Sequence, residues 1–82
     1  MQTIMLDGRL YQTPGQLHKA LQAMLQLPAY YGMNADALYD CLSERAEPVN
    51  VWVLAPAEGE AAPAFETCLH VFRDLGGKVT LL

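Results

Sequence analysis

The apolar positions along the chain alternate between short runs and helical stripes. A β-prone run at residues 3–6 is closed by the turn dipeptide Asp7-Gly8. Apolar residues then recur at helical spacing over residues 17–25, ahead of Pro28. Because the residue before a proline is pushed out of helical geometry, this pattern predicts a first strand and then a helix that ends before Pro28.

Capping signals mark where the first two helices begin. Thr13 is placed as an N-cap, with Pro14 at the first helical position and Gln16 able to complete a capping box. Asn34 is a good N-cap for a second helix over residues 35–44. Two consecutive helices are therefore expected after the first strand.

The second predicted helix has an apolar side and a polar side. Its buried side is marked by Leu38, Cys41 and Leu42, with Ala35 and Ala37 nearby. The opposite side carries Asp36, Tyr39, Asp40 and Ser43.

Two further strands and a third helix complete the expected order. Residues 49–54 form an almost unbroken apolar run, which is typical of a strand buried on both faces. A third helix should run from Pro63 to the Gly76-Gly77 pair, followed by a last strand at residues 78–82. The pattern predicts an α/β fold, a three-stranded parallel sheet packed by helices, in the order β-α-α-β-α-β.

Length and composition fit one small folded unit. With 82 residues, 52% hydrophobic and 17% charged, the chain is expected to be a single domain over residues 1–82 and not a disordered segment. Neither a membrane-spanning run nor a signal-peptide pattern is visible, which indicates a cytoplasmic protein without a membrane partner. Cys41 and Cys68 fit buried thiols in a reducing compartment better than a disulfide.

Charge narrows the choice of partner. The net charge of −4, with five basic residues in total, argues against a nucleic-acid surface, which needs clustered Lys and Arg. Most of the acidic residues fall between Asp36 and Asp74. A field of that sign favours a basic partner and speeds encounter with it.

Asp36 and Asp40 lie one turn apart on the polar side of the second helix, where two like charges cost a few tenths of a kcal/mol. Tyr30, Tyr31 and Tyr39 add aromatic surface beside them, as at interaction hot spots. Two alternatives stay open: acids on a solvated face with tyrosines packed on the core, or a general acid and base. The second requires a cleft that raises one pKa, and the pattern indicates none.

Other chemistry-bearing residues have simpler interpretations. His18 and His70 are expected on helix surfaces, without a second ligand at metal-type spacing. Cys41 falls on the buried side of its helix, so a packed thiol is expected there and not a nucleophile. Trp52 is expected in the core. No cofactor, metal ion or enzymatic activity is predicted.

The segment at residues 27–42, LPAYYGMNADALYDCL, resembles the signature of the barstar family. The shared pattern is leucine-proline, paired tyrosines, glycine and asparagine, and then a helix with aspartate, alanine, leucine, an aromatic residue and aspartate. The likeness extends more loosely to Leu17-His18 and to residues 71–74, and it fails over residues 55–66.

This resemblance implies a function without catalysis. Barstar-like proteins remain in the cytoplasm of the cell that makes a secreted ribonuclease and cap its active site one-to-one, which gives immunity to the cell's own toxin. By resemblance Asp40 is the central phosphate mimic, Asp36 supports it, and Tyr30 packs on the catalytic histidine. The predicted partner-binding set is Tyr30, Tyr31, Gly32, Asn34, Ala35, Asp36, Tyr39, Asp40, Ser43, Glu44 and Asp74.

Several positions depart from the family pattern. Ala35 occupies a position where the family pattern has leucine, Tyr39 and Arg45 occupy positions of tryptophan, and Asp74 occupies a position of glutamate. Residues 55–62 look too poor in helix formers to form an extra small helix. Arg45 would place a positive charge near a positive partner. The implied partner is a related but different ribonuclease or ribonuclease-like toxin. The alternative is an interaction module or immunity protein of the same fold whose basic partner is not a ribonuclease.

Overall fold

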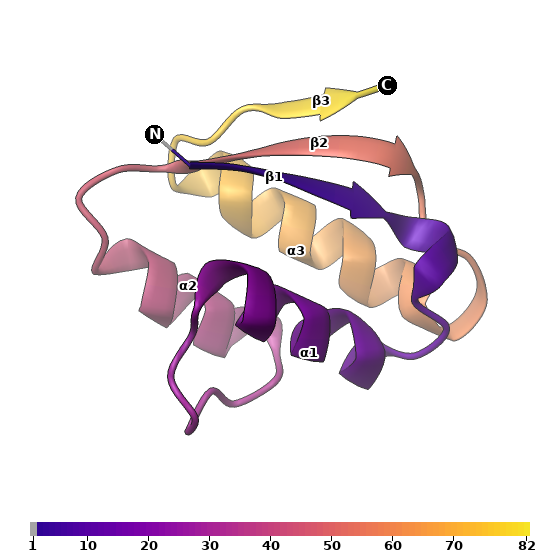
Figure 1. Ribbon diagram of the computed structural model, residues 1–82, viewed down its shortest axis with the longest axis horizontal. Helices are drawn as coiled ribbons and strands as arrows, with labels where there is room; N and C mark the ends of the chain where they lie inside the picture. Colours follow the sequence, from indigo (N-terminus) through magenta and orange to yellow (C-terminus); the bar gives the residue numbers. More distant parts are fainter. Residues whose placement is uncertain (1) are drawn as a thin grey trace.

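The computed structural model of the chain describes residues 2–82. The order β-α-α-β-α-β is confirmed (Figure 1). The elements are β1 (Gln2–Asp7), α1 (Pro14–Leu25), α2 (Ala35–Ser43), β2 (Val49–Ala55), α3 (Ala62–Asp74) and β3 (Val79–Leu81), with one-turn 3-10 helices η1 (Gly8–Leu10) and η2 (Gly59–Ala61).

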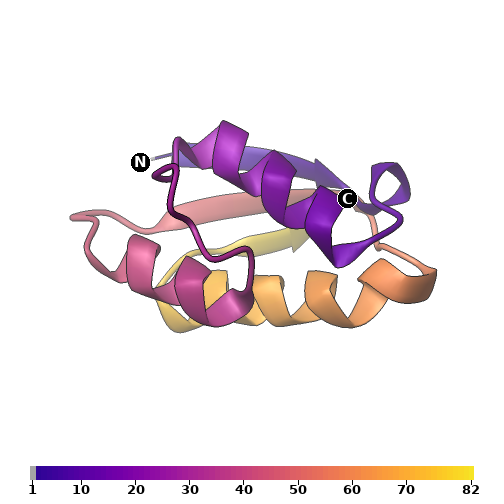
Figure 2. The same ribbon diagram turned by 90° about the horizontal axis from the view of Figure 1, so that it is seen from below.

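The three strands form one parallel sheet in the order β1-β2-β3. Ile4 pairs with Val51, and Val51 pairs with Val79, so these three side chains share one face. Because both crossovers move across the sheet in the same direction and crossovers are right-handed, the helices must collect on a single face. Figures 1 and 2 show all three helices on that face, where Phe65 and Phe72 fill the core.

The other face of the sheet is open. Met5, Trp52 and Leu54 project from it and are 50%, 46% and 43% exposed. The prediction that the second strand is buried on both faces is therefore wrong, and so is the placement of Trp52 in the core. Alternate residues of β2 point to opposite faces, and helices cover only one of them.

The predicted helix starts are confirmed by their caps. Thr13 Oγ1 accepts a hydrogen bond from the Gln16 N–H at 3.2 Å, and Asn34 Oδ1 accepts one from the Ala37 N–H at 2.8 Å. The Gln16 side chain accepts from the Gln12 N–H at 2.7 Å, so it satisfies the residue before the N-cap and not the N-cap itself. These bonds satisfy amides that a helix start otherwise leaves without an acceptor.

The second helix packs against α3. Leu38 and Leu42 are buried, while Cys41 is half-buried. The polar residues of α2 lie on the solvent side, as the sequence pattern predicts. The fold thus presents one side of a nine-residue helix to any partner.

Candidate partner-binding surface

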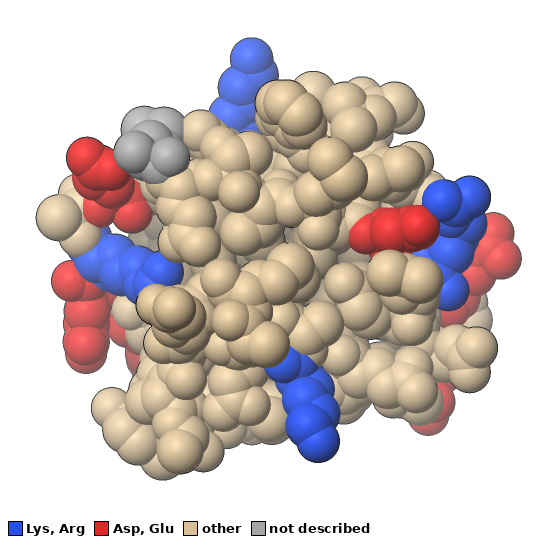
Figure 3. Space-filling model, in the orientation of Figure 1, with Lys and Arg blue, Asp and Glu red and all other residues tan. Residues whose placement is uncertain are grey.

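Most of the predicted partner-binding residues are exposed together on α2 and the loop before it. We call this exposed set the α2 face; it consists of Tyr30, Gly32, Asn34, Asp36, Tyr39, Asp40, Ser43 and Glu44. Asp36, Asp40 and Glu44 follow one another at four-residue spacing, which keeps them on one side of the helix. In Figure 3 acidic side chains lie at both the left and the right edge of the molecule, and those on the left, next to a basic side chain, are on the side where α2 ends in Figure 1.

The two adjacent tyrosines of the loop point in opposite directions. Tyr30 is 86% exposed, whereas Tyr31 is only 5% exposed and belongs to the core. Tyr31 therefore supports this surface from within. Ala35 is half-buried and packs against the core, while Tyr39 is 43% exposed and adds aromatic area beside the acids.

A groove joins the loop to α2. It has a volume of about 370 Å³, and its lining includes Tyr30, Asp40, Glu44 and Arg45. Two carboxylates thus share a concave surface with an aromatic ring from another segment. Such a site can accept charge-assisted hydrogen bonds from guanidinium or imidazolium groups and pack against their flat faces.

Arg45 is engaged within the molecule. Its guanidinium donates to the Leu25 carbonyl at the end of α1 and to Gln2 Oε1, the latter at 3.2 Å. A cation there interacts favourably with the negative end of the α1 dipole. These bonds account for the arginine at a position where the family pattern has tryptophan.

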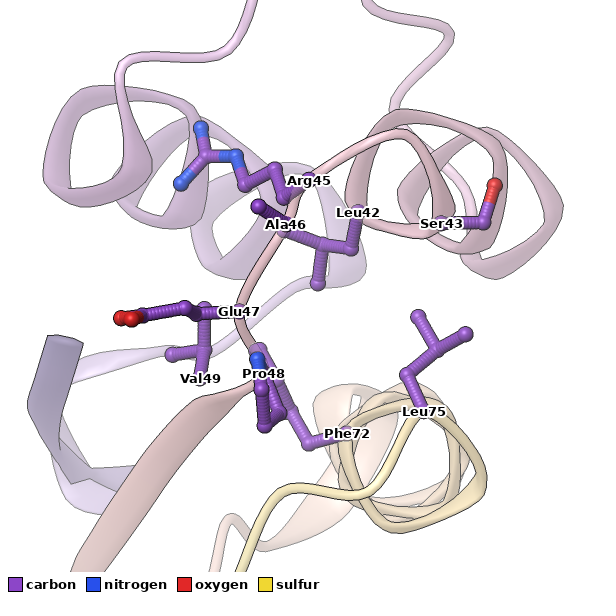
Figure 4. Close-up of a pocket in the computed structure, with 9 residues that line it drawn as sticks. All are labelled: Leu42, Ser43, Arg45, Ala46, Glu47, Pro48, Val49, Phe72 and Leu75. Carbon is purple, nitrogen blue, oxygen red and sulfur yellow. The ribbon is translucent and has the colours of Figure 1, made fainter. Parts of the chain in front are cut away.

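Asp74 is exposed at the last position of α3. Ser43 and Leu75 line one cavity, so the ends of α2 and α3 lie side by side (Figure 4). Asp74 therefore belongs to the end of the molecule where α2 also ends.

The cavity between these two helix ends is not a ligand site. Its volume is about 110 Å³, below the roughly 300–1,000 Å³ typical of small-molecule pockets. In Figure 4 the charged ends of Arg45 and Glu47 point away from Phe72 and Leu75.

His18 is buried and not on the helix surface, so that prediction is wrong. Its side chain is 3% exposed, and its Nδ1 lies 2.7 Å from the Tyr31 hydroxyl. Burial lowers the pKa of His18 below its usual value and so favours the neutral ring. The spacing of His18, Leu21 and Leu25 is that of a buried helix stripe, and this was the signal available in the sequence.

His70, in contrast, is exposed, as predicted. Both cysteines are free thiols; Cys68 is buried, as expected, whereas Cys41 is only half-buried. Cys68 is buried, and burial raises its pKa to about 12, so the thiol stays protonated.

Met33 is a surface residue that the sequence analysis did not single out. It is 39% exposed and adopts a left-handed backbone conformation with φ of 57°. In the sequence, the only indication that Met33 is exposed is its position between Gly32 and the N-cap Asn34, where the chain turns into α2. Met33 adds apolar surface next to the α2 face.

Within residues 2–82, no three His, Cys, Asp or Glu side chains are grouped so that they could hold a metal ion. None of the helices in this described range has the length and apolarity needed to cross a membrane.

A small parallel α/β domain that displays acidic and aromatic side chains on one exposed helix has the features of a protein-binding domain. The model of the family described as "Barstar (barnase inhibitor)" matches residues 1–80, and the chain therefore belongs to the barstar family of ribonuclease inhibitors. It is also similar to a Bacillus subtilis (strain 168) protein named "Putative ribonuclease inhibitor YrdF", with 46% identity over 43 residues. That match spans 52% of this chain and 47% of the relative, about half of each.

Proposed function

We propose that this protein inhibits a secreted barnase-type ribonuclease or ribonuclease toxin by capping its basic active site with the α2 face. The complex is one-to-one, and it protects the cytoplasm of the cell that makes the toxin. The observation that carries this proposal is the groove in which Asp40 and Glu44 face the exposed Tyr30.

The chemistry of the two surfaces is complementary. A ribonuclease holds RNA phosphates with Lys, Arg and His side chains, and carboxylates fixed on a helix can occupy the same positions. Charge-assisted hydrogen bonds between such groups are about twice as strong as neutral ones. Asp40 takes the central position, with Asp36 supporting it from the first turn of α2.

The charge distribution supports docking at this end of the molecule. At the far end of β1, Asp7 is neutralised by Arg9, whose guanidinium lies 2.8 Å from the carboxylate. Glu58 and Glu60 lie beside Arg9 at that end, while the α2 face carries three acids, Asp36, Asp40 and Glu44. A negative surface potential of this kind raises the rate of encounter with a basic enzyme.

The first test replaces Asp40 with alanine. Asp40→Ala should weaken binding to a barnase-type ribonuclease by at least about tenfold, because a hydrogen bond to a charged partner contributes about 1.5–3 kcal/mol. Binding is measured by calorimetry or surface plasmon resonance, and RNA cleavage is followed with the same two proteins.

Glu58→Ala is the matched control for Asp40→Ala. It removes the same charge from an exposed site at the opposite end of the molecule, where Glu58 lines a cavity with Arg9. Equal losses of affinity in the two variants would contradict a specific role for Asp40. Tight binding to a basic partner without loss of RNA cleavage would favour a barstar-fold interaction module over a ribonuclease inhibitor.

A further inference from the structure

The loop that carries Tyr30 is attached to α1 at two points. Gln22 Nε2 donates to the Pro28 carbonyl at 2.9 Å, and His18 Nδ1 lies 2.7 Å from the Tyr31 hydroxyl. His18 and Gln22 are four residues apart, so they project from the same side of α1. Tyr30 lies between the two attached positions and is nonetheless 86% exposed.

The attachment continues into the start of α2. The Tyr31 hydroxyl donates to the Asn34 carbonyl at 3.3 Å, and the same carbonyl accepts the N–H of Leu38 at 3.0 Å, a bond at the first turn of the helix. The core is thus connected by hydrogen bonds to the residue that caps α2.

The attachment also continues into the core. His18 Nδ1 shares a hydrogen bond with the Tyr31 hydroxyl at 2.7 Å, and His18 Nε2 lies 3.9 Å from Cys68 Sγ. A neutral imidazole has one donor and one acceptor nitrogen, so both ring nitrogens have a partner. The members of this connected set come from α3, α1, the loop and α2.

We propose that His18 and Gln22 are positioning residues for partner binding, which hold Tyr30 and the first turn of α2 in the geometry that the partner recognises. This inference rests on the proposed function. Fixing a loop in its bound conformation before contact reduces the entropy lost on association, so affinity falls when the fixing bonds are removed. Neither side chain needs to touch the partner.

If His18 and Gln22 only stabilised the fold, a different result would be expected. Removing a buried hydrogen bond would then lower the free energy of unfolding, while the folded fraction would bind as tightly as wild type. The experiment must therefore measure both quantities under conditions in which every variant is folded.

The test pairs Tyr31→Phe with Tyr11→Phe as a control, because both remove one phenolic hydroxyl and Tyr11 lies at the other end of the molecule, beside Gly8 and Glu58. Tyr31→Phe should weaken binding to a barnase-type ribonuclease about three- to tenfold, and Tyr11→Phe should leave it unchanged. Equal affinities of Tyr31→Phe and wild type would overturn the proposal.

A double-mutant cycle tests whether His18 acts through Tyr30. His18→Leu and Tyr30→Ala should each weaken binding, and the loss in the double variant should be smaller than the product of the two single losses. His18→Asn keeps a hydrogen-bonding side chain near the Nδ1 position and should recover part of the affinity lost in His18→Leu. Multiplicative losses and no recovery would count against positioning.

Hydrogen exchange provides a readout that needs no partner. In Tyr31→Phe the amides of Ala37 and Leu38 should exchange faster than in wild type by a larger factor than amides of β2, and unchanged rates would overturn the attachment of α2. If wild type and Asp40→Ala bind the ribonuclease equally, the proposed function fails. If only Asp40→Ala is weakened and Tyr31→Phe binds normally, the positioning role alone fails.

Discussion

At the scale of single residues, the stability of the folded protein depends on His18 being neutral. Its ring is buried between Tyr31 and Cys68, and burial lowers its pKa from the ordinary value of 6.5. A second ring proton would have to be placed between the Tyr31 hydroxyl and the Cys68 thiol, neither of which carries a charge that would favour it, because burial raises the pKa of both groups. The folded protein therefore binds this proton less readily than the unfolded chain does.

Stability should consequently fall as pH is lowered. Above pH 6.5 the stabilising contribution of neutral His18 is fully present, and it is lost as pH falls from 6.5 through the lower pKa of the folded state. Urea unfolding between pH 7.5 and 5 should show a steeper loss for wild type than for His18→Leu. Equal slopes in the two proteins would show that His18 is not the titrating group.

The sequence predicts the exposed acids better than the buried polar residues. Asp36 and Asp40 are on the solvent side because helical periodicity fixes which residues share a side with Leu38. His18 could not be placed in the same way. A polar side chain is buried where it finds a partner, and its partner Tyr31 is 13 residues away in sequence. Sequence also leaves open which of Tyr30 and Tyr31 faces the core.

At the scale of elements, α2 is short and depends on its start. A nine-residue helix is marginal in isolation, and Asn34 stabilises it by accepting the Ala37 N–H while its amide donates to the Gly32 carbonyl at 3.1 Å. The helix that presents the acids is therefore held by packing on α3 and by this cap.

Asn34→Ala should lower the free energy of unfolding by about 1 kcal/mol, because an N-cap side chain is lost. Urea denaturation monitored by circular dichroism measures this change. Asn34→Asp retains a capping oxygen and serves as the control, with stability close to wild type. A loss in Asn34→Asp as large as that in Asn34→Ala would show that the bond to Gly32, and not the cap, is the stabilising one.

The sequence largely predicts where each helix and strand begins and ends, because local capping chemistry sets these bounds. It does not predict that all the helices cover one face of the sheet. Thr13, Asn34 and the Gly76-Gly77 pair mark helix ends because caps need particular side chains or left-handed backbone, and Gly76 has φ of 91°. The apolar run of β2 gives no indication that one of its faces is open. That follows from the strand order β1-β2-β3, which is set by tertiary packing.

At the scale of the whole molecule, the acidic surface and the open sheet face are separate features. The α2 face lies on the layer of helices (Figure 1), while Met5, Trp52 and Leu54 are exposed on the opposite side of the sheet. In the proposed function, the net charge of −4 and the groove between Tyr30 and α2 would direct a basic enzyme to the helix layer. If the α2 face caps the active site of that enzyme, RNA and this protein compete for the active site.

Steady-state cleavage of RNA by a barnase-type ribonuclease, at several concentrations of RNA and of this protein, tests that competition most directly. Capping predicts that the apparent KM for RNA rises with inhibitor concentration while kcat at saturating RNA is unchanged. A fall in kcat at saturating RNA with an unchanged KM would place the protein outside the active site and contradict the capping mechanism.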